Sequence, residues 1–150
     1  MIGPTTVAEL FNSPNWDELL EEYESEAAVR GTPPISAKIG TYRSLEQHGV
    51  LYPFAAHRDH LLIGFITVLA APLPHYDRVF AVSESFFVAK AHRMSGAGLK
   101  LLHLAEMRAR ELGSPGLFVS APFEGDLYKV LPRLDYQETN RVFFKAFYDA

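Results

Sequence analysis

An apolar strand pattern that leads through a glycine turn into a long helix constrains this chain more than any other segment. Residues 79–88 are typical of a strand, Arg93 to Gly98 read Arg-x-x-Gly-x-Gly, and residues 94–112 place apolar side chains at helical spacing. Glycines let the backbone approach a ligand, and the start of a helix presents N–H groups without partners. Because the positive end of the helix dipole lies there as well, the turn predicts an anion site, most often for a phosphate.

The rest of the pattern predicts two helices, a run of antiparallel strands, and then alternating strands and helices. The expected elements are helices over 14–28 and 36–47, hairpin strands over 50–56 and 61–70, a proline loop over 72–77, a short buried strand over 116–121, a short helix over 126–134 and a final aromatic strand over 141–148. This order predicts an α/β fold of the α+β layered kind, with a mixed, mostly antiparallel sheet flanked by helices. The length predicts a single domain over residues 1–150.

Composition argues against several classes of function. The net charge of −4 gives no general attraction to nucleic acid or to anionic membranes. The absence of cysteine excludes disulfides and thiolate metal sites, and the histidines show no metal-ligand spacing, so no metal is expected. The N-terminus has no signal-peptide pattern, and the apolar run 61–73 is too short to span a bilayer. We therefore expect a cytoplasmic protein.

Three interpretations compete for the glycine turn. A dinucleotide fold needs a third glycine, whereas this turn has only Gly96 and Gly98 and follows an antiparallel pattern. A P-loop needs Gly-Lys-Ser/Thr, which is absent. The third interpretation fits the residues better: the turn resembles the acyl-coenzyme A pyrophosphate turn, Gln/Arg-x-x-Gly-x-Gly/Ala, of the GNAT N-acetyltransferase superfamily.

The resemblance extends over roughly residues 61–147. Ser-Phe-Phe-Val at 85–88 is similar to the family's fourth strand, Leu-Lys-Leu-Leu-His-Leu-Ala-Glu at 99–106 to its long third helix, and Gly-Leu-Phe-Val-Ser-Ala at 116–121 to its fifth strand. The chain departs from the family where Leu131 stands in place of the usual Tyr and Asp135 in place of a Gly. Leu-Pro-His-Tyr at 73–76 and the segment 136–145 resemble phage or prophage members.

The resemblance implies acetyl-coenzyme A as the cofactor and a primary amine as the acceptor. It assigns cofactor-binding residues at the end of the fourth strand and in the turn. Those of the strand are Phe86, Phe87 and Val88, with the Val88 N–H as the candidate to stabilise the developing oxyanion. Those of the turn are Arg93, Met94, Ser95, Gly96, Ala97, Gly98 and Leu99.

The catalytic residues are less clearly marked. Glu84 is the candidate base, because strand alternation places it with Phe86 and Val88 on one face, half-buried; the alternative is a surface carboxylate in an ion pair. Tyr128 is the candidate acid, and the alternative is a packing residue. His75 and Tyr76, in the proline loop, are candidates for substrate binding, although loop residues of this kind are more often simply exposed.

The helix over 14–28 carries an acidic face, which is either a solvated surface or a rim that attracts a cationic acceptor. Its members are Asp17, Glu18, Glu21, Glu22, Glu24 and Glu26. The resulting hypothesis is an acetyltransferase acting on a small cationic amine or on a Lys or N-terminal amine of a protein. The alternative is a GNAT-fold module that binds coenzyme A or a protein and has lost catalysis. Dimers are common in the family, and the aromatic last strand could pair across a homodimer.

Overall fold

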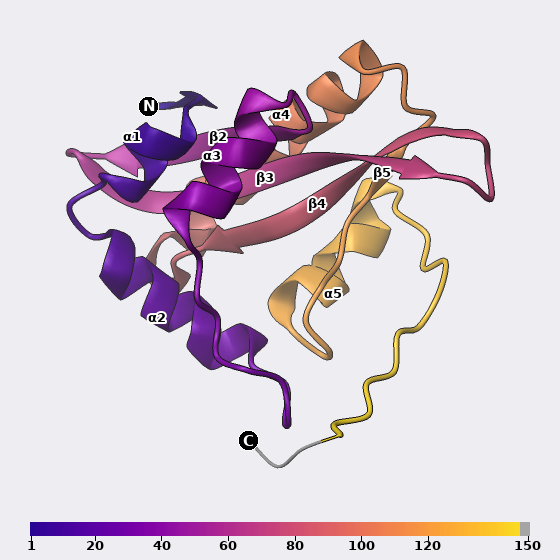
Figure 1. Cartoon of the computed structure of the whole chain (residues 1–150). Coiled ribbons are helices and arrows are strands. Elements are labelled where there is room, and N and C mark those ends of the chain that lie inside the picture. Colours follow the sequence, from indigo (N-terminus) through magenta and orange to yellow (C-terminus); the bar gives the residue numbers. More distant parts are fainter. Residues whose placement is uncertain (148–150) are drawn as a thin grey trace.

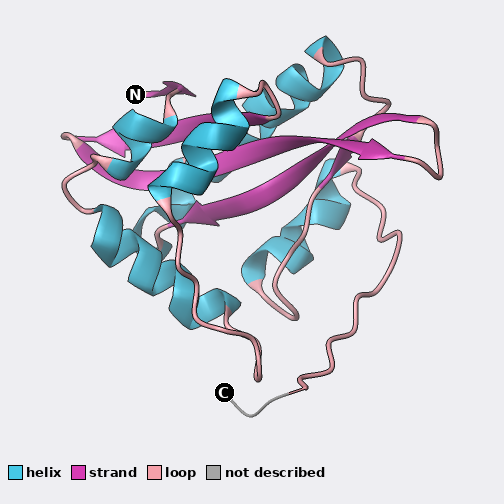
Figure 2. Ribbon diagram, viewed as in Figure 1, coloured by secondary structure: helices cyan, strands magenta, loops and turns pink. Residues whose placement is uncertain are grey.

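A computed structural model of the chain describes residues 1–147. Five strands form one sheet in the order β1-β2-β3-β4-β5, and helices cover both of its faces (Figure 1, Figure 2). All neighbouring strands are antiparallel except β4 and β5, which are parallel. The mixed α/β layered fold expected from the sequence is confirmed.

Three strands joined by tight turns form the centre of the sheet. They are β2 (Leu51–Arg58), β3 (Leu61–Leu73) and β4 (Arg78–Val88), and β1 (Ile2–Pro4) adds to the outer edge of β2. The β2–β3 turn consists of Asp59 and His60, both at positive φ, as in the two-residue turns that suit the twist of a hairpin. The predicted proline loop is partly wrong. Because β3 continues through Pro72 and Leu73, only residues 74–77 form the turn.

The N-terminal helices cover one face of the sheet. They are α1 (Val7–Phe11), α2 (Trp16–Ala27) and α3 (Ile39–Gln47). Trp16 and Leu19 of α2 are buried against Phe65 of β3 and Phe87 of β4, so this apolar core closes the first layer. The two predicted helices are confirmed with shifted starts, and α1 was not predicted because its five residues are too few to show a period.

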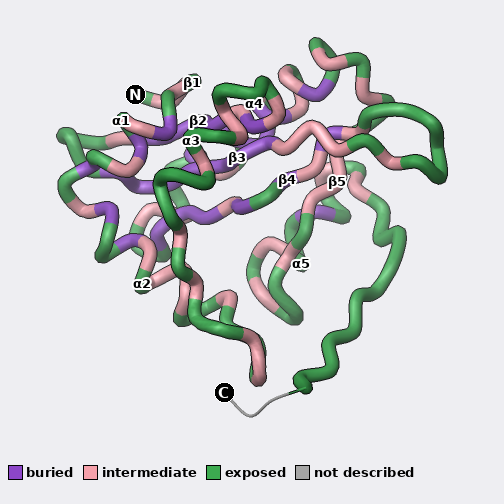
Figure 3. Tube along the Cα trace, in the orientation of Figure 1, coloured by how far each residue is buried: buried purple, intermediate pink, exposed green. Residues whose placement is uncertain are grey.

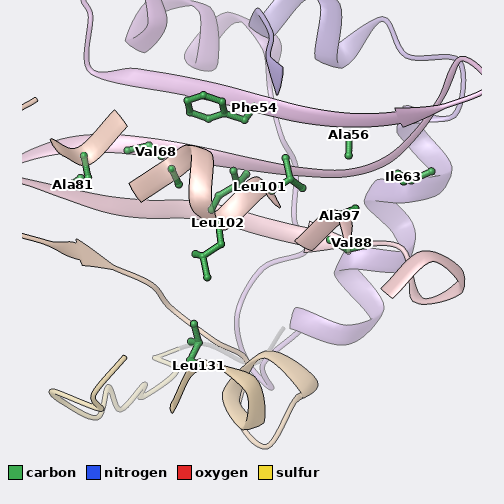
Figure 4. Packing of buried hydrophobic residues seen from close by; sticks show 13 residues of the cluster. Phe54, Ala56, Ile63, Val68, Ala81, Val88, Ala97, Leu101, Leu102 and Leu131 are labelled. Carbon is green, nitrogen blue, oxygen red and sulfur yellow. The ribbon is translucent and has the colours of Figure 1, made fainter. Parts of the chain in front are cut away.

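The long helix α4 (Ala97–Glu111) covers the opposite face. Leu101 and Ala105 of α4 are fully buried against Ile66 and Val68 of the sheet. Figure 4 shows Leu131 pointing toward Leu102 of α4 from the segment below. The prediction placed the start of this helix three residues too early, because Lys90–Ser95 form a separate 3-10 helix, η1, that ends at Gly96.

The last part of the chain departs from the prediction. The expected strand 116–121 is only β5 (Leu117–Phe118), and the expected helix 126–134 is α5 (Asp126–Val130) followed by the 3-10 helix η2 (Leu131–Leu134). The expected final strand is wrong for the described residues of 141–148, since residues 141–147 are in no strand (Figure 3, green). Its many aromatic residues made this segment strand-like, but a strand also needs another strand to pair with, and the described residues of this segment pair with none.

Among residues 1–147, no helix has both the length and the apolar character that crossing a membrane requires. Within the same range, no group of three or more His, Asp or Glu side chains is placed to hold a metal ion.

Candidate cofactor and acceptor site

Strands β4 and β5 diverge soon after they meet, which leaves the C-terminal half of β4 with an open edge. The two strands pair only at Ala81–Leu117 and Val82–Phe118. At the next position the Ser120 N–H donates to the Ser83 hydroxyl (3.2 Å) in place of a backbone carbonyl. No strand among residues 1–147 covers this edge of β4 beyond that point.

The direction of the backbone N–H groups on this edge follows from their neighbours. The Ser85 N–H donates to Thr67 Oγ1 of β3 (3.1 Å), and the Ala89 N–H donates to the Ile63 carbonyl (2.8 Å). Because alternate residues of an antiparallel strand direct their N–H groups to opposite sides, those of Phe86 and Val88 face the open edge. Both groups are therefore available to a ligand beside β4.

A cavity of about 440 Å³ lies against this open edge. Phe86, Phe87 and Val88 form its wall on the β4 side, and Leu127 and Val130 of α5 form the opposite wall. Arg93, Gly96, Gly98 and Leu99 of the predicted turn line it as well. Its size is typical of a ligand pocket. The strand end and the glycine turn, predicted separately as cofactor contacts, thus meet at one cavity.

The turn before α4 combines a left-handed glycine with the start of a helix beside the cavity. Gly96 has φ +83°, a conformation that favours glycine, and a Cβ built on it would meet nothing within 4 Å. Ser95 Oγ donates to the His92 carbonyl (2.5 Å) and accepts from the Ala97 N–H (3.3 Å), so it supports the turn from within. The first turn of α4 leaves its other leading N–H groups without intrahelical partners, and these favour an anion.

Arg93 is engaged by carboxylates of two other elements. Its guanidinium forms ion pairs with Glu26 of α2 and with Asp126 of α5, the latter at 3.0 Å, and Nε donates to the Val88 carbonyl (3.0 Å). Partial burial lowers the pKa of Arg93, but the hydrogen bonds and charges of the two carboxylates outweigh it and raise that pKa overall. In this state Arg93 joins α2, β4 and α5 around the cavity.

Glu84 lies at a β-bulge. Thr67 of β3 faces Ser85, and Val68 faces Ser83, so Glu84 is the extra residue of β4 between them. A bulge redirects the side chain it carries. The prediction that Glu84 shares a face with Phe86 and Val88 is therefore wrong: its carboxylate lies on the side of the N-terminal helices, and the residue is exposed, not half-buried.

Two hydroxyl groups hold the Glu84 carboxylate. Tyr42 Oη of α3 donates to Oε1 (2.7 Å), and Thr67 Oγ1 of β3 lies 2.8 Å from Oε2 as its donor. Burial and the negative charge of Glu84 raise the pKa of Tyr42 well above its usual range, so Tyr42 remains a proton donor in this bond. Tyr23 of α2 stacks on Phe87 with ring centroids 5.2 Å apart, and burial and Glu84 raise its pKa too.

The sequence did not predict a place at the site for Tyr23, Tyr42 or Thr67. Tyr42 lies 42 residues from Glu84 and Thr67 lies 17 residues away, so no local spacing connects them. One signal was present in hindsight: Thr67 is a polar residue inside the apolar run of β3, and such a residue needs a hydrogen-bond partner when buried.

Other predicted residues lie outside the cavity. Among the described residues, Tyr128 of α5 is not part of its lining, and neither are Met94, Ser95 and Ala97. His75 and Tyr76 lie in the β3–β4 turn, at the opposite end of β4 from Val88, because the hairpin extends away from the site (Figure 1). Their rings meet edge to face, with centroids 5.0 Å apart.

Half of the acidic face of α2 makes structural bonds. Glu22 accepts from the Lys90 N–H (2.8 Å), Glu24 accepts from the Ile35 N–H (2.6 Å), and Glu26 pairs with Arg93. The face is therefore not only a solvated surface: it fixes the start of η1 and the segment between α2 and α3.

Comparison with solved structures identifies the architecture. The ribosomal-protein-alanine N-acetyltransferase of Brucella melitensis biovar Abortus 2308 matches with a TM-score of 0.70 at 16% identity, covering 99% of this chain and 98% of that one. Aminoglycoside N-acetyltransferase AAC(6')-Iy in complex with CoA matches with a TM-score of 0.72 at 19% identity, over 97% of each chain. This chain has the GNAT N-acetyltransferase fold.

A third GNAT structure, aminoglycoside acetyltransferase meta-AAC0020 from an uncultured soil metagenomic sample in complex with sisomicin, matches with a TM-score of 0.71 at 16% identity, covering 99% of this chain and 96% of that one. The resemblance to the GNAT superfamily thus extends to the whole fold. No family model and no curated protein sequence matches the chain.

Proposed function

We propose that this protein is an N-acetyltransferase that moves acetyl from acetyl-coenzyme A to a primary amine. One observation carries the proposal: the open edge of β4 and the N–H groups of the turn before α4 border the same cavity. A thioester cofactor with an extended amide arm and a pyrophosphate needs both surfaces at once. The GNAT fold, and the CoA bound to one structure that shares it, support this choice.

The residues of the cavity fit such a cofactor. Phe86 and Val88 direct backbone N–H groups to the open edge, where they can bind the amides of the pantetheine arm. Gly96 leaves open space in front of the turn, where the N–H groups at the start of α4 can hold the pyrophosphate. Bound there, acetyl-coenzyme A supplies the activated acetyl group.

We propose Glu84 as the general base. Its carboxylate lies on the side of the N-terminal helices, and Glu84 precedes Phe86 of the cavity wall by two residues along β4. From there it can take a proton from the acceptor amine directly or through a water. The amine nitrogen then bonds to the thioester carbon, the carbon–sulfur bond breaks, and the thiolate receives a proton. The Val88 N–H, at the open edge, would stabilise the negative charge on the carbonyl oxygen. Tyr128 stays a prediction as the proton donor, and α5 would have to shift for it to reach the sulfur.

The acceptor proposed for this site is cationic: a small polyamine-like molecule or a protein amine. Three carboxylates of α2 bond to no other residue in the range 1–147 and leave that helix with exposed negative charge: Asp17, Glu18 and Glu21. The sisomicin complex and the ribosomal-protein acetyltransferase among the structural neighbours support an amine acceptor without choosing between the two kinds.

A second candidate function is a GNAT-fold module that binds coenzyme A without catalysis. Leu131 favours it, because this residue stands where the family usually has its Tyr and is buried against α4 with 8% of its surface exposed. A buried Leu at that position offers no proton to a leaving thiolate.

The proposal is tested by two glycine variants with the same backbone strain. Gly96→Glu places a carboxylate at the proposed pyrophosphate site, and Gly113→Glu makes the same change at the far end of α4; both glycines have positive φ (+83° and +76°) and open space at Cβ. Calorimetry should show that Gly96→Glu abolishes acetyl-coenzyme A binding and that Gly113→Glu retains it. Release of the free thiol against a panel of amines then measures turnover.

Equal affinity in the two variants would contradict the assignment of the turn. Binding by the wild-type protein without turnover on any amine would favour the non-catalytic module. Loss of binding in Gly96→Glu, together with turnover on a cationic amine by the wild-type protein, would establish the acetyltransferase.

A further inference from the structure

Thr67 is the one polar side chain of β3. The strand reads Leu-Leu-Ile-Gly-Phe-Ile-Thr-Val-Leu-Ala-Ala-Pro-Leu, and Thr67 is buried with 1% of its surface exposed. A valine has nearly the same shape, favours strands as well, and buries no hydroxyl group. Because a buried hydroxyl costs free energy unless it is hydrogen-bonded, the reason for a threonine at this position lies in the bonds that it makes.

The Thr67 hydroxyl meets three groups of β4. Its Oγ1 accepts from the Ser85 N–H (3.1 Å) and lies 2.8 Å from both Ser85 Oγ and Glu84 Oε2. The usual acceptor for a strand N–H is a backbone carbonyl of the neighbouring strand. Here a side-chain hydroxyl takes that role at the bulge, between the pairs Thr67–Ser85 and Val68–Ser83. Thr67 thus bonds both the backbone at the bulge and the carboxylate that the bulge redirects.

The direction of these bonds follows from the protons available. The Ser85 N–H can only donate, and an ionised Glu84 carboxylate can only accept. The single proton of the Thr67 hydroxyl therefore points to Glu84 Oε2, and the Ser85 hydroxyl donates its own proton to Thr67 Oγ1. Thr67 then donates one bond and accepts two, which is the full capacity of a hydroxyl group. Since each bond polarises the next, this chain strengthens the bond to the carboxylate.

The Glu84 carboxylate is held from two layers of the fold. Phe65 packs under the N-terminal helices, and Thr67, two residues further along β3, shares that face of the sheet. Thr67 therefore approaches Glu84 from the sheet, while Tyr42 approaches it from α3. Each carboxylate oxygen accepts one hydroxyl and keeps a lone pair for a proton. A carboxylate fixed in this way can still act as a base.

We propose that Thr67 is a positioning residue, whose buried hydroxyl holds the β4 bulge and keeps the Glu84 carboxylate where it takes a proton from the amine. The inference rests on the proposed function, in which Glu84 is the general base, and deepens it. Neither Thr67 nor Ser85 lines the cavity, so the effect falls on the chemical step and not on cofactor binding. A base that is already in place loses no conformational freedom when it reacts.

The kinetics of variants at Thr67 test this role, with acetyl-coenzyme A and a panel of polyamines and lysine peptides. Thr67→Val keeps the shape and removes the hydroxyl, and it should lower kcat about tenfold, the factor that corresponds to one lost hydrogen bond to a charged group. Thr67→Ser restores the hydroxyl and should recover most of kcat. Affinity for acetyl-coenzyme A, measured by calorimetry, should stay unchanged in both variants.

Ser114→Ala is the matched control. Ser114 Oγ accepts from the Ala81 N–H of the same strand (2.9 Å), so it also stands in for a backbone acceptor, but it does not line the cavity. This variant should leave kcat unchanged. Circular dichroism checks that each variant is folded, and Thr67→Ala replaces Thr67→Val if a second methyl group does not fit beside the carboxylate.

Amide proton exchange, followed by NMR, reads the bulge in the protein without any ligand. Thr67→Val should speed the exchange of the Ser85 N–H, which loses its acceptor, and leave that of the Ala81 N–H unchanged. Ser114→Ala should have the opposite effect on the two groups. Thr67→Ser should exchange as the wild-type protein does.

An unchanged kcat in Thr67→Val would overturn the positioning role, as would a loss of kcat that Thr67→Ser does not restore or that Ser114→Ala reproduces. Equal exchange of the Ser85 N–H in Thr67→Val and in the wild-type protein would overturn it whether or not any amine is acetylated. A wild-type protein that turns over no amine would instead contradict the proposed function, and the exchange rates would still decide whether Thr67 holds the bulge.

Discussion

Glu84 illustrates how single residues define the proposed acceptor side of the site. The bulge brings its carboxylate to the side of the N-terminal helices, and the hydroxyls of Tyr42 and Thr67 each bond one carboxylate oxygen. Because its pKa is raised by burial and by Glu84, Tyr42 holds its proton and acts as a donor to the carboxylate. We therefore assign Tyr42 a positioning role and not that of an acid.

Tyr42→Phe should lower kcat about tenfold, and Glu84→Gln should lower it further, by the factor of roughly 10²–10⁴ that general bases contribute. Acetyl-coenzyme A affinity, measured by calorimetry, should stay unchanged in both, since neither residue lines the cavity. Tyr136→Phe is the control, because it removes an equivalent Tyr–Glu bond (Tyr136 to Glu106, 2.6 Å) outside the cavity. Equal kcat in Tyr42→Phe and Tyr136→Phe would show that Tyr42 does not position the base.

Helix α2 shows how one element connects distant parts of the chain. Its apolar face packs on the sheet through Trp16 and Leu19, while carboxylates of its other face reach backbone groups outside the helix. Glu24 accepts a hydrogen bond from the Ile35 N–H, which fixes the segment between α2 and α3 against α2. The acidic face thus contributes to the stability of the fold.

Glu24→Ala should lower the free energy of unfolding by about 1.5 kcal/mol, the usual value of a hydrogen bond to a charged group. Glu21→Ala should leave it nearly unchanged, because Glu21 is exposed and makes no hydrogen bond or ion pair to another described residue. Both variants change helix propensity equally, so urea denaturation of the pair isolates the Glu24 bond. Equal unfolding free energies would contradict the structural role of the face.

At the scale of the whole molecule, the N-terminus is joined to the centre of the sheet around His57. The Met1 ammonium donates to the His57 carbonyl (2.7 Å), and the His57 ring lies 3.2 Å from the Ser13 hydroxyl between α1 and α2. Burial and the positive N-terminus lower the pKa of His57 below its ordinary 6.5. The folded protein therefore favours neutral His57.

Acid should weaken the fold through this residue. Below pH 6.5, the unfolded chain binds a proton on His57, whereas the folded chain keeps His57 neutral to a lower pH. The contribution of His57 to the free energy of unfolding is therefore complete above pH 6.5 and is lost as the pH falls toward the pKa of the folded state. His57→Gln should flatten the dependence of the urea midpoint on pH between about 7 and 5, whereas His75→Gln, at an exposed turn, should leave it as in the wild-type protein. An unchanged slope in His57→Gln would exclude His57 as the cause.

Much of the fold followed from local pattern. The strand, glycine turn and helix of residues 79–112 were predicted, except that the helix starts three residues later than expected. The structure places the strand end and the turn at one cavity. The hairpin β2–β3 and the acidic helix α2 were also predicted, because periodicity and turn residues express themselves within a few positions. The final strand over 141–148 failed for its described residues because a strand needs a partner that pattern does not supply.

The sequence by itself determined the central hairpin, the strand β4, the helices α2 and α4 and the glycine turn between β4 and α4, since their causes lie in neighbouring residues. Only the tertiary structure decided where Glu84 points, because a bulge exists only in the register between two strands. The same holds for Arg93, whose carboxylate partners lie 67 and 33 residues away along the chain. Hydrogen bonds and ion pairs between such distant positions depend on how the elements pack, and local periodicity carries no information about that packing.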